Sequence, residues 1–99
     1  MKNNMVTKDD IIKKLEKVYD PELGIDIWTL GLVYDINIKS EDDVTITLTY
    51  TTPMCPFGPM LNQLVEQAMM ELGFTEIYVN VTFDPPWKAP DNLREMLGV

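Results

Sequence analysis

The sequence contains no histidine and a single cysteine, Cys55. Without histidine, the chain lacks the usual general base near neutral pH, the usual partner of a nucleophilic thiol and the commonest nitrogen ligand of protein-bound metals. One cysteine forms no disulfide within the chain and supplies too few thiolates for a zinc cage. The sequence therefore excludes catalysis assisted by histidine, a disulfide scaffold and a multi-thiolate metal centre built from one chain.

Basic residues and long apolar runs are also scarce. Eight lysines and arginines against sixteen acidic residues give a formal net charge of −8, which repels phosphate backbones, so we expect no nucleic-acid partner. No run of consecutive apolar residues exceeds three, and residues 1–5 carry no apolar stretch. We therefore expect a cytoplasmic protein with no membrane partner.

The rest of the composition is that of a folded domain. Hydrophobic residues make up 45% of the 99-residue chain and charged residues 24%, which is typical of globular rather than disordered proteins. This length is enough to bury one core but not to hold a catalytic domain and a separate cofactor domain. We expect a single domain over residues 1–99.

Two segments have the apolar spacing of half-buried helices. From Thr7 to Tyr19, apolar residues recur three and four positions apart, and the Asp20-Pro21 step ends this predicted helix. A second predicted helix starts between residues 57 and 60 and ends at Leu72. The two predicted buried stripes are Ile11, Ile12, Leu15, Val18 and Tyr19, and then Leu61, Leu64, Val65, Ala68, Met69 and Leu72.

Three segments alternate between apolar and polar residues, as half-buried strands do. Residues 32–38 and 44–50 flank an acidic turn and predict an antiparallel hairpin, while residues 77–83 predict a third strand. The second helix connects strands two and three, so these strands should be parallel with a right-handed crossover. With a short last helix over residues 92–97, the order is α-β-β-α-β-α, an α+β fold with helices on one face of the sheet.

This topology brings three irregular loops to one edge of the sheet. The loops at residues 51–59 and 84–90 leave the two parallel strands, and the loop at residues 20–31 enters the antiparallel strand at the same edge. Open α/β sheets usually place their functional sites at this carboxyl edge. We therefore expect the chemistry of the protein to be found there.

Cys55 lies between the end of a predicted strand and the start of a predicted helix, in a segment stiffened by Pro53 and Pro56. The positive end of a helix dipole lowers the pKa of a nearby thiol. Residues 40–87, however, carry seven acids and no base, which opposes that effect. We expect a modestly activated thiol, while a small buried cysteine with no chemical role explains the same pattern equally well.

Two further features accompany the thiol at this edge. In the expected topology Asp20 and Glu22 lie beside Cys55, where they hold a metal together with the thiolate or form hydrogen bonds to residues 51–52. A plain helix-ending turn explains the two carboxylates more simply. The Asp-Pro-Pro-Trp segment at residues 84–87 is most simply a rigid strand exit with an aromatic lid, and either of its X-Pro bonds is a candidate for the cis form.

Four motifs follow one another along the chain: Asp20-Pro21-Glu22-Leu23-Gly24, Leu30-Gly31-Leu32-Val33-Tyr34, Thr51-Thr52-Pro53-Met54-Cys55-Pro56 and Asp84-Pro85-Pro86-Trp87. In this order and spacing the chain resembles the small PaaD-like and SufT-like iron–sulfur cluster assembly family over nearly its whole length. The resemblance implies an α+β fold and a role in maturing or delivering iron–sulfur clusters to apoproteins, or in accompanying multicomponent oxygenases. It implies that Cys55 and the turn of Asp20, Pro21 and Glu22 belong to the functional edge, with Thr51 and Thr52 beside them. We also assign to this edge Leu23, Pro53, Pro56 and Trp87.

Together, the resemblance and the residues favour a non-enzymatic accessory factor. A cluster normally needs four ligands, and we expect no stably bound cofactor. Two interpretations stay open: Cys55 supplies one ligand to a shared or transient iron or iron–sulfur site, or the protein binds no cluster and acts as an adaptor. The expected partners are iron–sulfur scaffold or client proteins, and a homodimer is left open. The alternatives are an interaction module with an inert Cys55, and a thiol enzyme whose base is Asp20 or Glu22, although an ordinary carboxylate is a poor base for a thiol.

Overall fold

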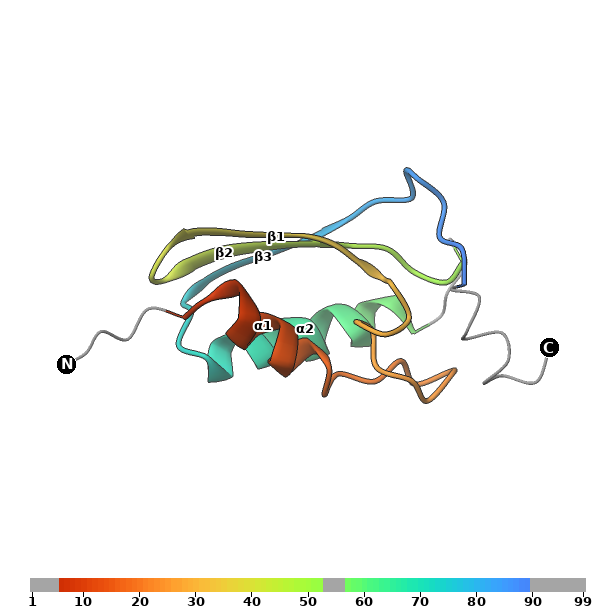
Figure 1. Ribbon diagram of the computed structural model, residues 1–99, viewed down its shortest axis with the longest axis horizontal. Helices are drawn as coiled ribbons and strands as arrows, with labels where there is room; N and C mark the ends of the chain where they lie inside the picture. Colours follow the sequence, from red (N-terminus) through yellow and green to blue (C-terminus); the bar gives the residue numbers. More distant parts are fainter. Residues whose placement is uncertain (1–5, 53–56, 90–99) are drawn as a thin grey trace.

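The computed structural model describes residues 6–52 and 57–89. These contain α1 (Lys8–Leu15), β1 (Val33–Ser40), β2 (Asp43–Leu48), α2 (Gly58–Glu71) and β3 (Glu76–Val81). The order α-β-β-α-β and the two layers in Figure 1, with both helices beneath one face of the sheet, confirm the predicted α+β fold. The short helix predicted over residues 92–97 lies outside the described residues. Within the described ranges, no helix is long and apolar enough to cross a membrane.

The sheet has the predicted pairing. Its order is β1-β2-β3, with β1 antiparallel to β2 and β2 parallel to β3. Ile36 pairs with Ile46, and Ile46 pairs with Val79, so one apolar row crosses all three strands. Because side chains alternate between the faces of a strand, the helices cover this row while Thr45 and Tyr78 lie on the opposite face.

The two helices bury the apolar stripes that pack against this face. α1 begins with a capping box, in which Thr7 Oγ1 accepts the N–H of Asp10 and Asp10 Oδ2 accepts the N–H of Thr7. α2 begins with a proline in its first turn and ends near Gly73, whose φ of +104° suits a glycine. The buried helical residues are Ile11, Leu15, Leu61, Val65, Ala68 and Met69.

The first helix is shorter than its apolar pattern predicts. α1 ends at Leu15 instead of Tyr19, because the backbone after it bonds to the following loop. The carbonyl of Val18 accepts the N–H of Ile27, and Tyr19 pairs with Asp26 in an isolated antiparallel bridge. Tyr19 therefore leaves the helical face that would bury it, and its side chain is 55% exposed.

Two further residues of the predicted apolar pattern are exposed. Leu64 was predicted to be part of the buried stripe of α2, but it is 36% exposed because α1 ends too early to cover it. Phe83 was predicted to belong to the third strand, but β3 ends at Val81. Instead, the exposed Phe83 ring packs edge to face on Tyr50, with ring centroids 5.8 Å apart.

Candidate functional site

Three loops meet at one end of the molecule, which is the right-hand end in Figure 1. We call the described parts of these loops, residues 18–32, 49–52 and 82–89, the loop rim. The first two are joined by a hydrogen bond from the N–H of Thr49 to the carbonyl of Leu32, at 2.8 Å. The first and third are joined by a hydrogen bond from Trp87 Nε1 to the carbonyl of Leu30, at 2.6 Å. The loop rim is therefore a connected surface, as the topology predicts.

Asp20 organises the turn that follows α1. Its side chain is 1% exposed, and Oδ1 accepts the N–H groups of Glu22 at 2.8 Å and Leu23 at 3.0 Å. Its own N–H donates to the carbonyl of Ile25, and its carbonyl accepts the N–H of Gly24, which has a φ of +70° that favours glycine. These contacts are those of the plain helix-ending turn, and none of them runs to residues 51–52.

The other residues of this turn divide between solvent and core. Pro21 and Glu22 are exposed, whereas Leu23 is half-buried and packs against the core. Within residues 6–52 and 57–89, Glu22 makes no ion pair. The carboxylate of Glu22 therefore faces solvent on the loop rim, whereas the carboxylate of Asp20 stabilises the turn itself.

Trp87 fixes the third loop to the first. Its indole is half-buried, and its hydrogen bond to Leu30 joins residues far apart in the sequence. At Gly31, with a φ of +76°, a Cβ atom would lie 3.9 Å from Trp87 Nε1, so the ring packs closely over the turn. Tyr34 adds a second tie, since its hydroxyl donates to the carbonyl of Pro85 at 2.7 Å. The Asp84–Pro85 bond is cis, one of the two candidates that the sequence offered.

The sequence did not identify Tyr50 and Gly58 as residues of the site. The Tyr50 hydroxyl donates to Asn62 Oδ1 at 3.1 Å, so this side chain joins the exit of β2 to the first turns of α2. A Cβ atom at Gly58 would lie 2.6 Å from Tyr50 Cε2, and only glycine fits beneath the ring in this arrangement. The one available signal was a glycine at the start of the second predicted helix, which follows a predicted strand that ends in the aromatic Tyr50.

The remaining predicted site residues follow Tyr50 in the chain. Thr51 and Thr52 are half-buried on the loop rim. Cys55, Pro53 and Pro56 lie outside the described residues, which resume at Phe57, the N-cap residue of α2. The structure therefore places Asp20, Glu22 and Trp87 with the two threonines at one end of the fold.

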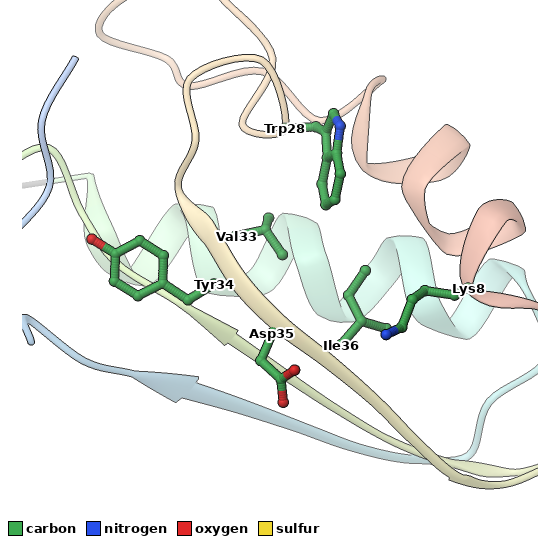
Figure 2. Close-up of a pocket in the computed structure, with 6 residues that line it drawn as sticks. All are labelled: Lys8, Trp28, Val33, Tyr34, Asp35 and Ile36. Carbon is green, nitrogen blue, oxygen red and sulfur yellow. The ribbon is translucent and has the colours of Figure 1, made fainter. Parts of the chain in front are cut away.

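A pocket of about 140 Å³ lies beside β1 and was not predicted from the sequence. Figure 2 shows Trp28 hanging from the first loop above Val33, and Lys8 reaching from α1 towards Ile36. The carboxylate of Asp35 points away from these side chains. Within the described ranges, no three histidine, cysteine or acidic residues are grouped as a metal site would need. The pocket is thus a mainly apolar recess beside the loop rim.

These features define a class of small α+β proteins in which a three-stranded mixed sheet carries helices on one face and an Asp-Pro turn and an Asp-Pro-Pro-Trp exit on one rim. A solved structure of a conserved hypothetical protein from Thermotoga maritima has the same fold, with a TM-score of 0.84, 42% identity and coverage of 99% of this chain and 100% of that one. The family model described as "Iron-sulfur cluster assembly protein" matches residues 8–83. The chain belongs to this family, which confirms the resemblance seen in its motifs.

Two curated relatives match most of the chain. The Fe-S protein maturation auxiliary factor YitW of Bacillus subtilis is 40% identical over 81 residues, which are 81% of this chain and 79% of that protein. The Fe-S protein maturation auxiliary factor SufT of Staphylococcus aureus is 42% identical over 71 residues, which are 71% of this chain and 81% of that protein. Both relatives are therefore similar to this chain over most of their own length.

Proposed function

We propose that this protein is an accessory factor that helps to assemble iron–sulfur clusters or deliver them to client apoproteins, acting through the loop rim. The observation that carries the proposal is the loop rim itself: the N–H of Thr49 and the indole N–H of Trp87 hold three loops together in a member of this family. The names of the two relatives, maturation auxiliary factors, support the same role. The expected partners are scaffold or client proteins in the cytoplasm.

Cys55 is the residue through which the loop rim contacts iron. It follows Thr52 of the loop rim by three positions and precedes Phe57, the N-cap residue of α2, by two. The first turn of α2 contains no acidic residue, so nothing within that turn offsets the positive end of the helix dipole, which favours a thiolate. One thiolate contributes one ligand, and the client protein or a small thiol supplies the others. Iron or a cluster is thus held transiently, as cargo.

The same features favour a factor over an enzyme. The chain has no histidine to activate a thiol, and Oδ1 of Asp20 is engaged by two backbone N–H groups of its own turn. The net charge of −8 favours association with basic surfaces on clients, and salt should weaken this association. The protein therefore acts by binding and positioning partners.

Anaerobic reconstitution tests the role of Cys55. The purified chain is incubated with ferrous iron, sulfide and a small thiol, and absorption spectra are compared for the wild type, Cys55→Ser and a control, Met70→Ser, at an exposed position of α2. We expect a charge-transfer absorption band in the wild type and in the control, and its loss in Cys55→Ser. Equal bands in all three proteins would refute Cys55 as the ligand, and no band in any of them would refute cluster binding by this chain.

A further inference from the structure

The two outer strands of the sheet differ in how their free edges are protected. β1 carries Lys39 and departs from regular register at two places along its length. Lysines and register irregularities of this kind keep an edge strand from pairing with another chain. β3 has neither, since Glu76–Val81 contains no lysine or proline and pairs with β2 without a register shift. Within the described residues no strand pairs with the outer edge of β3, so this edge is open to a further strand.

The hydrogen bonds of β3 show which of its backbone groups face outwards. The N–H of Glu76 donates towards β2, to the carbonyl of Asp42 at 2.8 Å. The N–H of Thr82 donates in the same direction, to the carbonyl of Leu48 at 2.9 Å. Successive residues of a strand direct their backbone groups to opposite edges, so the even-numbered residues of β3 bond to β2. The residues whose N–H and carbonyl groups point away from the sheet are Ile77, Val79 and Val81.

The surroundings of this edge are acidic. Glu76 is exposed at the start of β3, and Asp43 lies opposite it on β2. On the helical side, Glu66 of α2 lines a groove of about 390 Å³ that extends to the start of β3. A 3.2 Å hydrogen bond to Glu76, together with the charges of Glu76 and Asp43, raises the pKa of Tyr78 above its ordinary value of 10.0. Residues 40–87 contain no base, so nothing in this segment offsets the negative charge.

We propose that the edge of β3 docks an extended segment of a partner protein, in which basic residues alternate with apolar ones, as a fourth strand of the sheet. The backbone of this segment bonds to Ile77, Val79 and Val81. Its apolar side chains continue the row of these half-buried residues on the helical side, while its basic side chains lie near Glu76 on the opposite face. A second copy of this chain fits less well, because its own β3 brings one more acid and no base. The docking does not use Cys55, so it goes beyond the proposed function.

The probe is a capped peptide in which valine alternates with lysine and threonine, titrated into the full ¹⁵N-labelled chain. We expect saturable binding that slows hydrogen exchange at the amides of Ile77, Val79 and Val81 by at least about tenfold. Exchange at the free edge of β1 should not change. A matched peptide with glutamate in place of lysine should bind at least about tenfold more weakly, because the edge is acidic. No saturable binding, equal binding of both peptides, or unchanged exchange at the three amides would overturn the proposal.

N-methylated peptides separate strand pairing from contact through side chains alone. Methyl groups are placed on alternate backbone nitrogens of the lysine peptide, in two versions that block opposite edges of the added strand. One version should lose binding and the other should keep it within about threefold, because only one edge of the peptide faces β3. Equal losses with both versions, or no loss with either, would contradict backbone pairing.

Variants of β3 locate the contact. Val79→Pro removes an outward N–H but no hydrogen bond to β2, which an edge strand tolerates, and it should weaken binding at least about tenfold. Val79→Thr keeps the N–H and should bind within about twofold of the wild type. Glu76→Gln should weaken binding of the lysine peptide about threefold and reduce its salt dependence. Equal binding by the proline and threonine variants, with folding checked by far-UV circular dichroism, would refute the proposed edge, and the methylated peptides decide the same question on the unaltered chain.

Two controls separate this inference from its competitors. Cys55→Ser should bind the peptide as the wild type does, so failure of the cluster assay leaves this result interpretable on its own. Sedimentation velocity over a range of concentrations tests whether a second copy pairs with β3. We expect a monomer with an open edge, and a dimer that Val79→Pro dissociates would show that the occupant is another copy of this chain and overturn the proposal.

Discussion

Replacing Gly58 by alanine tests the connection between the exit of β2 and the start of α2. A Cβ atom there would lie 2.6 Å from Cε2, 2.7 Å from Cζ and 3.0 Å from the hydroxyl oxygen of Tyr50. The ring must therefore move by about 1 Å to reach ordinary van der Waals contact. Its hydroxyl then loses the 3.1 Å hydrogen bond to Asn62, and its edge-to-face contact with Phe83 is disturbed.

The size of the effect follows from these contacts. Overpacking costs about 1–3 kcal/mol, which includes a hydrogen bond of about 1 kcal/mol, while alanine regains up to about 0.5–1 kcal/mol in a helix. We expect Gly58→Ala to lower the free energy of unfolding by about 1–2 kcal/mol. For a domain of this size that lowers Tm by roughly 5–15 °C.

A double-mutant cycle checks the cause. Urea unfolding is followed by far-UV circular dichroism for the wild type, Gly58→Ala, Tyr50→Val and the double variant. Without the ring, Gly58→Ala should be neutral or slightly stabilising, which gives a coupling free energy of about 1–2 kcal/mol. The same loss in both backgrounds would show that the ring of Tyr50 is not what excludes a side chain at Gly58.

Three other substitutions probe the loop rim and the first helix. Asp20→Ala should lower the free energy of unfolding by about 1–3 kcal/mol, since it removes the acceptor of two part-buried N–H groups of the turn. Asp20→Asn should cost less because an acceptor oxygen remains, and equal urea midpoints for the two variants would refute this. Trp87→Phe removes the 2.6 Å bond to Leu30 and should cost about 1–2 kcal/mol, with faster amide exchange in residues 28–32 and unchanged exchange in α1 as the control. The hydrogen bond from the Thr7 backbone holds the pKa of Asp10 below its ordinary value of 3.8, so its stabilisation is complete above pH 3.8 and is lost as pH falls through the lower folded value. The difference in stability between wild type and Asp10→Asn should shrink over that range, and a constant difference would contradict the capping role.

Local patterns were enough to predict most of the fold. The alternation over residues 44–48 and 77–81 and the helical stripe around Val65 are each set by neighbours in sequence, and they gave the parallel pair and its crossover. The end of α1 was not predictable in this way, because the bridge from Tyr19 to Asp26 competes with helical hydrogen bonds that the same residues would otherwise form. Exposure of Leu64 follows from that shorter helix.

The sequence predicted where the loop rim lies in the fold, but it did not predict the contacts between its loops. The predicted topology alone brings the three loops together, and the Asp20-Pro21 step predicts a turn at Asp20. The contacts of Trp87 with Leu30 and of Tyr50 with Gly58 depend on how the loops are stacked in space, and no periodic pattern encodes that stacking. Their physical role is to fix the shape of the loop rim, where we propose that the chemistry takes place.

The role of Cys55 in maturing client proteins is tested by measuring the cluster content of a client in cells. The gene is replaced by the wild type, Cys55→Ser or Met70→Ser, protein levels are matched by immunoblot, and iron and sulfide are determined in a purified hydro-lyase that requires a [4Fe–4S] cluster. We expect Cys55→Ser to lower the cluster content to the level of a deletion strain and Met70→Ser to leave it at the wild-type level. Full cluster content with Cys55→Ser, in cells where deletion lowers it, would contradict a role for the thiol in maturation.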